Sequence, residues 1–271
     1  MPDINQQIEK IAARFAQLPQ VEAVAVGGSQ AAGTANAQSD TDIYIYTQTD
    51  LSRETRYGIG REFADTVQII DFWGPGMEWV DRETGMHMDI VFFGAEWMAD
   101  QVERVLTRHE AGLGYTTCFW HTMRVSRPVY DRQGWLARLH ERAQAPYPDE
   151  LVRAIVTLNF PVLRDVFPSY RTQIAKAASR DDLVSLNHRT AALLASYFDI
   201  LFAVNRQTHP GEKRLLATAE QVCPNRPPNM RTHVTALLDA TVHQPGEAAR
   251  CVDALVDELE TLLKGEELRE K

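Results

Sequence analysis

The stretch that decides the fold is Val24–Ser29 (VAVGGS), followed after a short spacer by Ser39–Tyr46 (SDTDIYIY). The apolar residues of the first run predict the end of a β-strand. Gly27 and Gly28 then allow a tight turn, because a backbone without side chains lets a ligand approach closely. Ser29 adds a hydroxyl at an expected helix start, where unpaired N–H groups favour a phosphate. This succession of an apolar run, two glycines and a serine predicts a strand and a turn that bind a phosphorylated ligand.

Three acids carry the expected chemistry. Asp40 and Asp42 stand two residues apart, so on a strand both carboxylates project from one face. Such a pair repels unless it is exposed, protonated or neutralised by a cation, and hard oxygen ligands of this kind suit Mg²⁺. Asp89 stands in the otherwise apolar run Met86–Phe93. If the two strands are neighbours, the three carboxylates can bind two metal ions, and Asp89 is also a candidate base for an acceptor hydroxyl.

The pattern along the chain predicts an α+β protein in two parts. Runs rich in Val, Ile, Tyr and Phe predict strands, and apolar residues at three- and four-residue spacing predict helices. The expected strands are Val21–Val26, Asp42–Tyr46, Val67–Ile70 and His87–Phe93, and the expected early helices are Ile4–Gln17 and Ala95–His109. Beyond residue 131 only helical patterns continue, near residues 134–144, 149–170, 181–207, 211–222, 228–241 and 246–269. We therefore expect a mixed sheet with flanking helices in residues 1–131 and an all-helical bundle in residues 132–271.

Composition narrows the class of protein. The 271 residues include 28 Lys and Arg against 37 Asp and Glu, a formal net charge of −9, with 44% hydrophobic residues. The sequence has no long run of Lys and Arg, so a polynucleotide partner is not expected. No apolar run is long enough for a membrane span. The three cysteines, Cys118, Cys223 and Cys251, form no C-x-x-C pair, so zinc-ribbon and redox motifs are excluded. A cytoplasmic location is the expectation.

At the glycine turn and the acids the sequence resembles the DNA polymerase beta-like nucleotidyltransferase superfamily. Its signature is an apolar residue, a Gly-Gly/Ser turn, a spacer of about ten residues, Asp-x-Asp/Glu and a third acid on a later strand. The resemblance covers roughly residues 20–95, with Thr41 in place of the more usual apolar residue between the acids. Within the superfamily the chain looks most like the stand-alone bacterial enzymes that adenylylate aminoglycosides and lincosamides. Those enzymes also carry a C-terminal helical bundle.

The resemblance implies transfer of a nucleoside monophosphate, from ATP or another nucleoside triphosphate with Mg²⁺, to the hydroxyl of a small molecule. The metal ligands and catalytic residues it implies are Asp40, Asp42 and Asp89. The nucleotide-binding candidates are Gly27, Gly28, Ser29, Ser39 and, from the helical part, Lys213. Three alternatives stay open: adenylylation of a protein partner as in an antitoxin, nucleotide sensing without catalysis, and a cleft completed by a homodimer.

Two further features have more than one interpretation. His87 is expected on the same strand face as Asp89. It is compatible with a role beside the metal or substrate, and more so with a strand-end histidine satisfied by the backbone. The stretch Asp71–Gly85 is acidic, aromatic and rich in glycine. It is expected to be a loop that either contacts a cationic or sugar-like acceptor or merely connects two strands.

Overall fold

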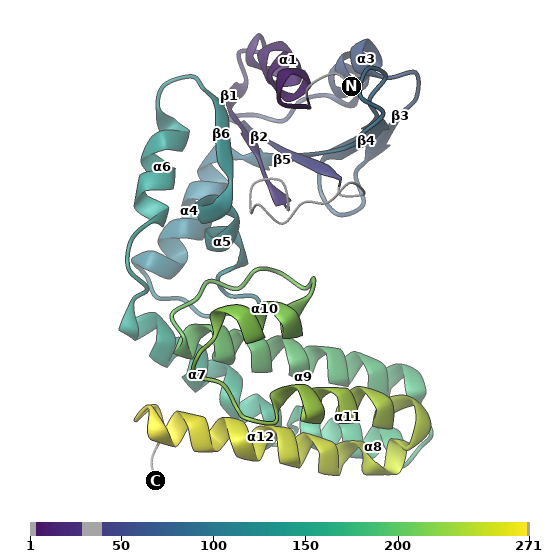
Figure 1. Cartoon of the computed structure of the whole chain (residues 1–271), viewed down its shortest axis with the longest axis vertical. Helices are drawn as coiled ribbons and strands as arrows, with labels where there is room; N and C mark the ends of the chain where they lie inside the picture. The colour runs from purple at the N-terminus through teal and green to yellow at the C-terminus, as the bar shows by residue number, and fades with distance from the viewer. Residues whose placement is uncertain (1–3, 29–39, 270–271) are drawn as a thin grey trace. The chain divides into compact units, whose positions relative to one another are not determined.

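The structure of the protein is a computed structural model, which describes residues 4–28 and 40–269 (Figure 1). Contacts divide the chain into two compact units. The first comprises Met1–Glu103 and Phe119–Ala145, and the second comprises Arg104–Cys118 and Pro146–Lys271. The expected division at residue 131 stays a prediction, because contacts define compact units rather than segments that fold alone.

The first unit is built on a six-stranded mixed sheet, counted over the described residues. Its order is β3-β4-β5-β2-β1-β6. The strands are β1 (Val21–Val26), β2 (Thr41–Thr47), β3 (Val67–Ile70), β4 (Gly76–Val80), β5 (His87–Gly94) and β6 (Arg127–Asp131). The pair β2 and β5 is parallel and all other pairs are antiparallel. The mixed sheet with flanking helices confirms the fold class expected from the sequence.

Two helices cover one face of this sheet, α1 (Ile4–Ala16) and α3 (Arg53–Phe63) (Figure 1). Their apolar residues form one core with the strand residues that point toward them, including Ile43 and Ile45 of β2. Because side chains alternate along a strand, the intervening residues of β2 and β5 face the opposite side. That alternation places Asp42 and Asp89 away from the α1–α3 core.

The opposite face is covered at one end by aromatic side chains. They come from β2, β5, α4 (Ala95–Leu106), α5 (Cys118–Val125) and α6 (Trp135–Ala143). The ring of Tyr46 lies 5.2 Å from that of Trp135, and Phe93 stacks on Trp97 at 6.0 Å between centroids. Further along the same strands Asp42 and Asp89 remain half-buried. The uncovered end of this face is where polar residues gather.

Two strands and two helices of this unit were not expected, namely β4, β6, α3 and α5. The stretch Asp71–Gly85, expected to be a loop, contains β4 at its centre. Its alternation is only five residues long and lies among glycines, which is typical of turns. Helix α3 is polar and contains Gly58 and Gly60, which lowers helix propensity. Gly60 is nevertheless favoured because a Cβ there would press on Val67 and Met77.

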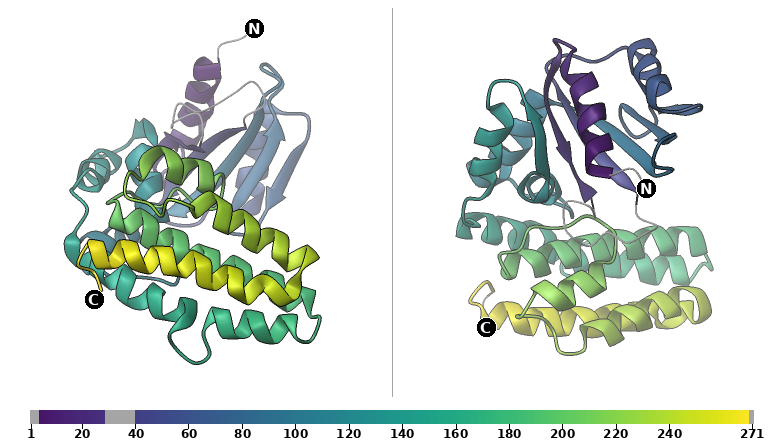
Figure 2. Two further views of the ribbon diagram at one scale, coloured as in Figure 1. Left: turned by 60° about the horizontal axis from the view of Figure 1, so that its bottom comes forward. Right: turned by 45° about the horizontal axis from the view of Figure 1, so that its top comes forward.

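The second unit is a helical bundle, as expected. Its helices are α7 (Asp149–Arg164), α8 (Tyr170–Ala178), α9 (Leu183–Val204), α10 (Leu215–Val222), α11 (Met230–His243) and α12 (Ala248–Gly265). The apolar helix α9 packs against α7, α8 and α11 (Figure 2). The helix expected near residues 149–170 ends at Arg164, and α8 was not expected. The chain turns at Pro168, and Ser169 caps α8 by accepting the Thr172 N–H. No helix in the described part of the chain is long and apolar enough to cross a membrane.

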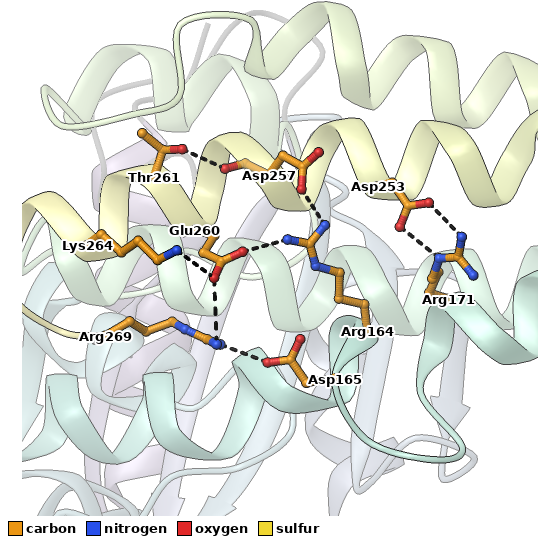
Figure 3. Close-up of polar contacts among 9 residues, drawn as sticks. All are labelled: Arg164, Asp165, Arg171, Asp253, Asp257, Glu260, Thr261, Lys264 and Arg269. Atoms are coloured by element: carbon orange, nitrogen blue, oxygen red, sulfur yellow. Dashed lines mark hydrogen bonds and ion pairs between the residues drawn. The ribbon is translucent and has the colours of Figure 1, made fainter. Parts of the chain in front are cut away.

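A network of ion pairs joins α7 and α8 to α12 (Figure 3). Arg164 reaches both Asp257 and Glu260, and Arg171 makes a two-pronged contact with Asp253 at 2.7 Å for each bond. Lys264 also approaches Glu260, at 3.1 Å. The network fixes the register of α12 against the two earlier helices.

Candidate active site

One line of paired residues crosses the sheet on its uncovered face. Gln68 of β3 pairs with Glu78 of β4, Glu78 pairs with Asp89 of β5, and Asp89 pairs with Asp42 of β2. The line ends beside β1, where the Gly27 N–H donates to the Asp42 carbonyl at 2.9 Å. Residues paired in register project from the same face of a sheet. Four strands therefore present one polar row, and three of its members are acids.

Asp42 and Asp89 are direct neighbours in this row. They occupy matching positions of the parallel pair β2–β5, and neighbouring strands lie about 4.8 Å apart. Burial raises the pKa of Asp89, and the charges of Asp42 and Glu78 raise it further, against a smaller opposite effect of His87. Two carboxylates this close are stable together only if one is protonated or a cation neutralises them. The condition set in the sequence analysis is therefore met for Asp42 and Asp89, because their strands β2 and β5 are neighbours.

Asp40 lies just before β2 and is exposed. Its Oδ1 atom is 3.4 Å from Nδ1 of His87, and Nε2 of the same histidine is 3.6 Å from Oε2 of Glu78. His87 therefore lies between two carboxylates rather than being satisfied by the backbone alone. Asp40 belongs to the next row of the sheet, offset from Asp42 and Asp89 toward the strand ends.

The glycine turn fits closely against this row. Gly28 has a φ of +55°, a left-handed conformation, and a Cβ there would overlap Oδ2 of Asp42. A Cβ on Gly27 would overlap the ring of Tyr44, whose hydroxyl contacts the backbone of Gly28. Burial and the charge of Asp42 raise the pKa of Tyr44 to about 12. The turn thus requires glycine at both positions for space and at Gly28 also for conformation.

A comparison with known protein families finds a match for the part of the chain that contains the glycine turn. Residues 9–73 match the family described as Polymerase beta, Nucleotidyltransferase. The matched span contains the whole Gly27–Asp42 region and ends before Glu78 and Asp89. The nucleotidyltransferase match therefore lies on the glycine turn and on the strand that carries Asp42.

Solved structures give more distant similarities. A nucleotidyltransferase-like protein from Exiguobacterium sibiricum 255-15 is 12% identical, with a TM-score of 0.46 over 97% of this chain and 75% of that chain. The Thermotoga maritima CCA-adding enzyme complexed with tRNA is 13% identical, with a TM-score of 0.33 over 100% of this chain and 85% of that chain. A CCA-adding enzyme in complex with CTP is 14% identical, with a TM-score of 0.33 over 100% and 68%. No curated protein matches the chain.

The donor set fits Mg²⁺ as a site of two carboxylates. Within the described residues no three His, Cys, Asp or Glu side chains form a group that could hold a metal ion. Mg²⁺ does not need such a cage, because it is commonly bound by one or two carboxylates together with water and substrate phosphates. Asp42 and Asp89 meet that requirement in register. The assignments of Asp40, Asp42 and Asp89 as metal ligands stay predictions.

Glu78 is an acid of the row that the sequence placed in an expected loop, Asp71–Gly85, rather than on a strand. It lies at the centre of β4 between buried Met77 and buried Trp79, so its side chain faces the acids while its neighbours enter the core. The sequence signal that could have placed Glu78 on a strand was the alternation Met-Glu-Trp, which is typical of a strand with one buried face. Phe72 and Trp73 of the same stretch lie exposed before this strand.

Two predicted nucleotide contacts, Ser29 and Ser39, lie outside the described residues. Lys213 is exposed in the turn before α10, in the second unit. Its contact with a triphosphate stays a prediction from the family resemblance.

Proposed function

We propose that this protein is a Mg²⁺-dependent nucleotidyltransferase that moves a nucleoside monophosphate, AMP from ATP, onto a hydroxyl of a small molecule. The observation that carries the proposal is the in-register pair Asp42–Asp89 beside the Gly27–Gly28 turn. The family match on residues 9–73 supports the same chemistry.

The residues have distinct roles in this proposal. Gly27, Gly28, Ser29 and Ser39 orient the phosphates through backbone N–H groups and hydroxyls, and Lys213 neutralises phosphate charge. Asp40, Asp42 and Asp89 are the ligands of one or two Mg²⁺ ions. When bound, the metal supplies positive charge to the reacting phosphate and to the leaving oxygen.

The reaction is an in-line displacement at the α-phosphorus. The acceptor oxygen forms a bond to that phosphorus while the bond to the bridging α–β oxygen breaks and pyrophosphate leaves. The acceptor's proton passes to a carboxylate of the row, for which Asp89 is the candidate because its pKa is raised by burial and neighbouring acids. A raised pKa brings a carboxylate nearer to the value that suits a general base at neutral pH.

An aminoglycoside-like or lincosamide-like compound is the proposed acceptor. The resemblance of the glycine turn and acids to antibiotic adenylyltransferases supports this choice, as does the acidic face of the sheet. A protein acceptor, or nucleotide binding without transfer, would appear as a different outcome of the same assay.

The test is incubation of the protein with Mg²⁺ and α-³²P-labelled ATP against a panel of aminoglycosides, lincosamides and cell lysate. Labelled small-molecule product with release of pyrophosphate is expected. Asp42→Asn should abolish the transfer, while Asp50→Asn, a change of an exposed carboxylate in the loop after β2, should keep it. Label on a protein band or the absence of any transfer would contradict the proposed acceptor or the proposed activity, respectively. Full transfer by a folded Asp42→Asn variant would refute the assignment of the site.

A further inference from the structure

A cavity of about 600 Å³ lies on the acid-bearing face of the sheet, at its β3–β4–β5 side. Gln68, Glu78, Val80 and His87 line it from positions that share this face by strand register. Pockets that bind small molecules commonly have volumes of about 300–1,000 Å³. The cavity is therefore large enough for a small-molecule substrate, and Glu78 belongs both to its wall and to the acidic row.

Most charges around the cavity are already compensated. Arg82 pairs with Asp65 at 2.8 Å. The carboxylate of Asp81 accepts hydrogen bonds from the side chains of Gln7 and Thr84 and from the backbone N–H groups of Thr84 and Glu83. These groups hold the turn together and leave little charge for a ligand.

Glu78 is different. Its side chain is 34% exposed, and within the described residues its ion pair is with His87, at 3.6 Å. Asp89 stands next to it on β5 and Asp40 lies on the far side of His87. A ligand in the cavity therefore meets a half-buried carboxylate in a negative field, which favours a cation over a neutral group.

The cavity also has the right place in the row. The glycine turn adjoins Asp42 at one end, the cavity adjoins Glu78 at the other, and Asp89 lies between them. A nucleotide held by the turn and a second substrate held in the cavity would approach the same central carboxylate from two sides. This order along the sheet is what an in-line transfer between two substrates requires.

We propose that this cavity is the acceptor subsite and that Glu78 binds an ammonium group of a cationic, hydroxyl-bearing acceptor. Glu78 is then a specificity-determining residue, which holds the acceptor so that a neighbouring hydroxyl faces Asp89. The inference rests on the proposed function, because it assigns the second substrate of that same site.

The experiment measures equilibrium binding by calorimetry, which needs no turnover. The probes are kanamycin, a sugar with several ammonium groups, spermidine, which has ammonium groups without hydroxyls, and trehalose, which has hydroxyls without charge. The unaltered protein is expected to bind kanamycin, and trehalose should bind at least tenfold more weakly. Glu78→Gln should weaken kanamycin binding about tenfold or more, because a charge-assisted hydrogen bond is lost.

Glu83→Gln is the matched control. Glu83 is an exposed glutamate in the β4–β5 turn that pairs with Lys10 and does not line the cavity. This control should bind kanamycin as the unaltered protein does, and thermal unfolding should show that both variants are folded. Equal binding of trehalose, no binding of kanamycin, or unchanged kanamycin binding by Glu78→Gln would each overturn the proposal. If Asp42→Asn still abolishes transfer in those cases, the proposed function stands and only the acceptor subsite is wrong.

Discussion

Gly28 combines a left-handed backbone with a position directly over the carboxylate of Asp42. Only glycine adopts such a conformation without cost, and only glycine leaves the carboxylate where it is. The sequence made this residue visible through its place between an apolar strand and a pair of acids. Glu78 could be recognised in the sequence only as one acid of the stretch Asp71–Gly85, because its pairing with Asp89 joins two strands and leaves no local motif.

Gly28→Ala should lower nucleotide transfer at least tenfold and destabilise the fold by about 1–2 kcal/mol, since an L-residue is strained at this φ and its Cβ displaces Asp42. Transfer kinetics and urea unfolding measure the two effects. Gly58→Ala is the control, because a Cβ at this position of helix α3 meets nothing within 4 Å. That change should be neutral or stabilising by about 0.5–1 kcal/mol. Equal behaviour of the two variants would show that the turn needs no glycine at residue 28.

The single residue Asp199 makes the stability of the second unit depend on pH. It is buried in α9, where Thr116 donates from its N–H at 3.0 Å and from its hydroxyl at 2.6 Å. Burial raises the pKa of Asp199 to about 7, against smaller opposite effects of the Thr116 hydrogen bonds and of Arg104. Between pH 4 and 7 the folded protein therefore keeps a proton that the unfolded chain releases.

The free energy of unfolding should accordingly fall as the pH rises from 4 to 7, by at most about 4 kcal/mol from this group, and the group should add no further change above pH 7. Asp199→Asn should remove this part of the slope, because an amide occupies the same space without titrating. Asp239→Asn, an exposed change in α11, should leave the slope intact. Urea unfolding at a series of pH values measures it, and an Asp199→Asn profile parallel to that of the unaltered protein would refute the assignment.

At the scale of elements, the sequence was most informative where apolar residues formed a regular pattern of their own. The expected strands Val21–Val26 and Val67–Ile70 have those bounds in the structure, and α1 ends one residue before its expected end. The sequence did not predict strands β4 and β6 or helices α3, α5 and α8, because short or polar elements depend on tertiary packing rather than on a pattern of their own. The sequence could not predict that β2 and β5 are neighbours and could only assume it. The structure shows that they pair in parallel.

The ion pairs between α7 and α12 give a prediction at this scale. Arg164 is 19% exposed and contacts both Asp257 and Glu260 (Figure 3). Arg164→Met should lower the free energy of unfolding by about 1–2 kcal/mol, because it removes the arginine that pairs with Asp257 and one of the cations that pair with Glu260. Arg250→Met is the control, since Arg250 is an exposed residue whose pair with Glu247 lies within one turn. Its effect should stay within about 0.5 kcal/mol. Equal losses in the two variants, measured by urea unfolding, would contradict a bridging role for Arg164.

At the scale of the whole molecule, the sequence predicted a mixed sheet followed by a helical bundle, and the structure confirms both. The order of the segments and the proline breaks were enough for this, since they separate a region of period-two patterns from one of helical patterns. The sequence could not identify the acceptor, because the proposed acceptor subsite is assembled from β3, β4 and β5 rather than from a continuous motif. The roles of Ser29, Ser39 and Lys213 stay predictions from the resemblance.

The central claim is that Asp42 and Asp89 act together on one divalent cation. Its most direct test is the binding of Mn²⁺, followed by electron paramagnetic resonance, in the presence of α,β-methylene-ATP. The unaltered protein and Asp50→Asn should bind the ion, whereas Asp42→Asn and Asp89→Asn should each weaken its binding at least tenfold while remaining folded. Undiminished Mn²⁺ binding by either of these two variants would contradict the account.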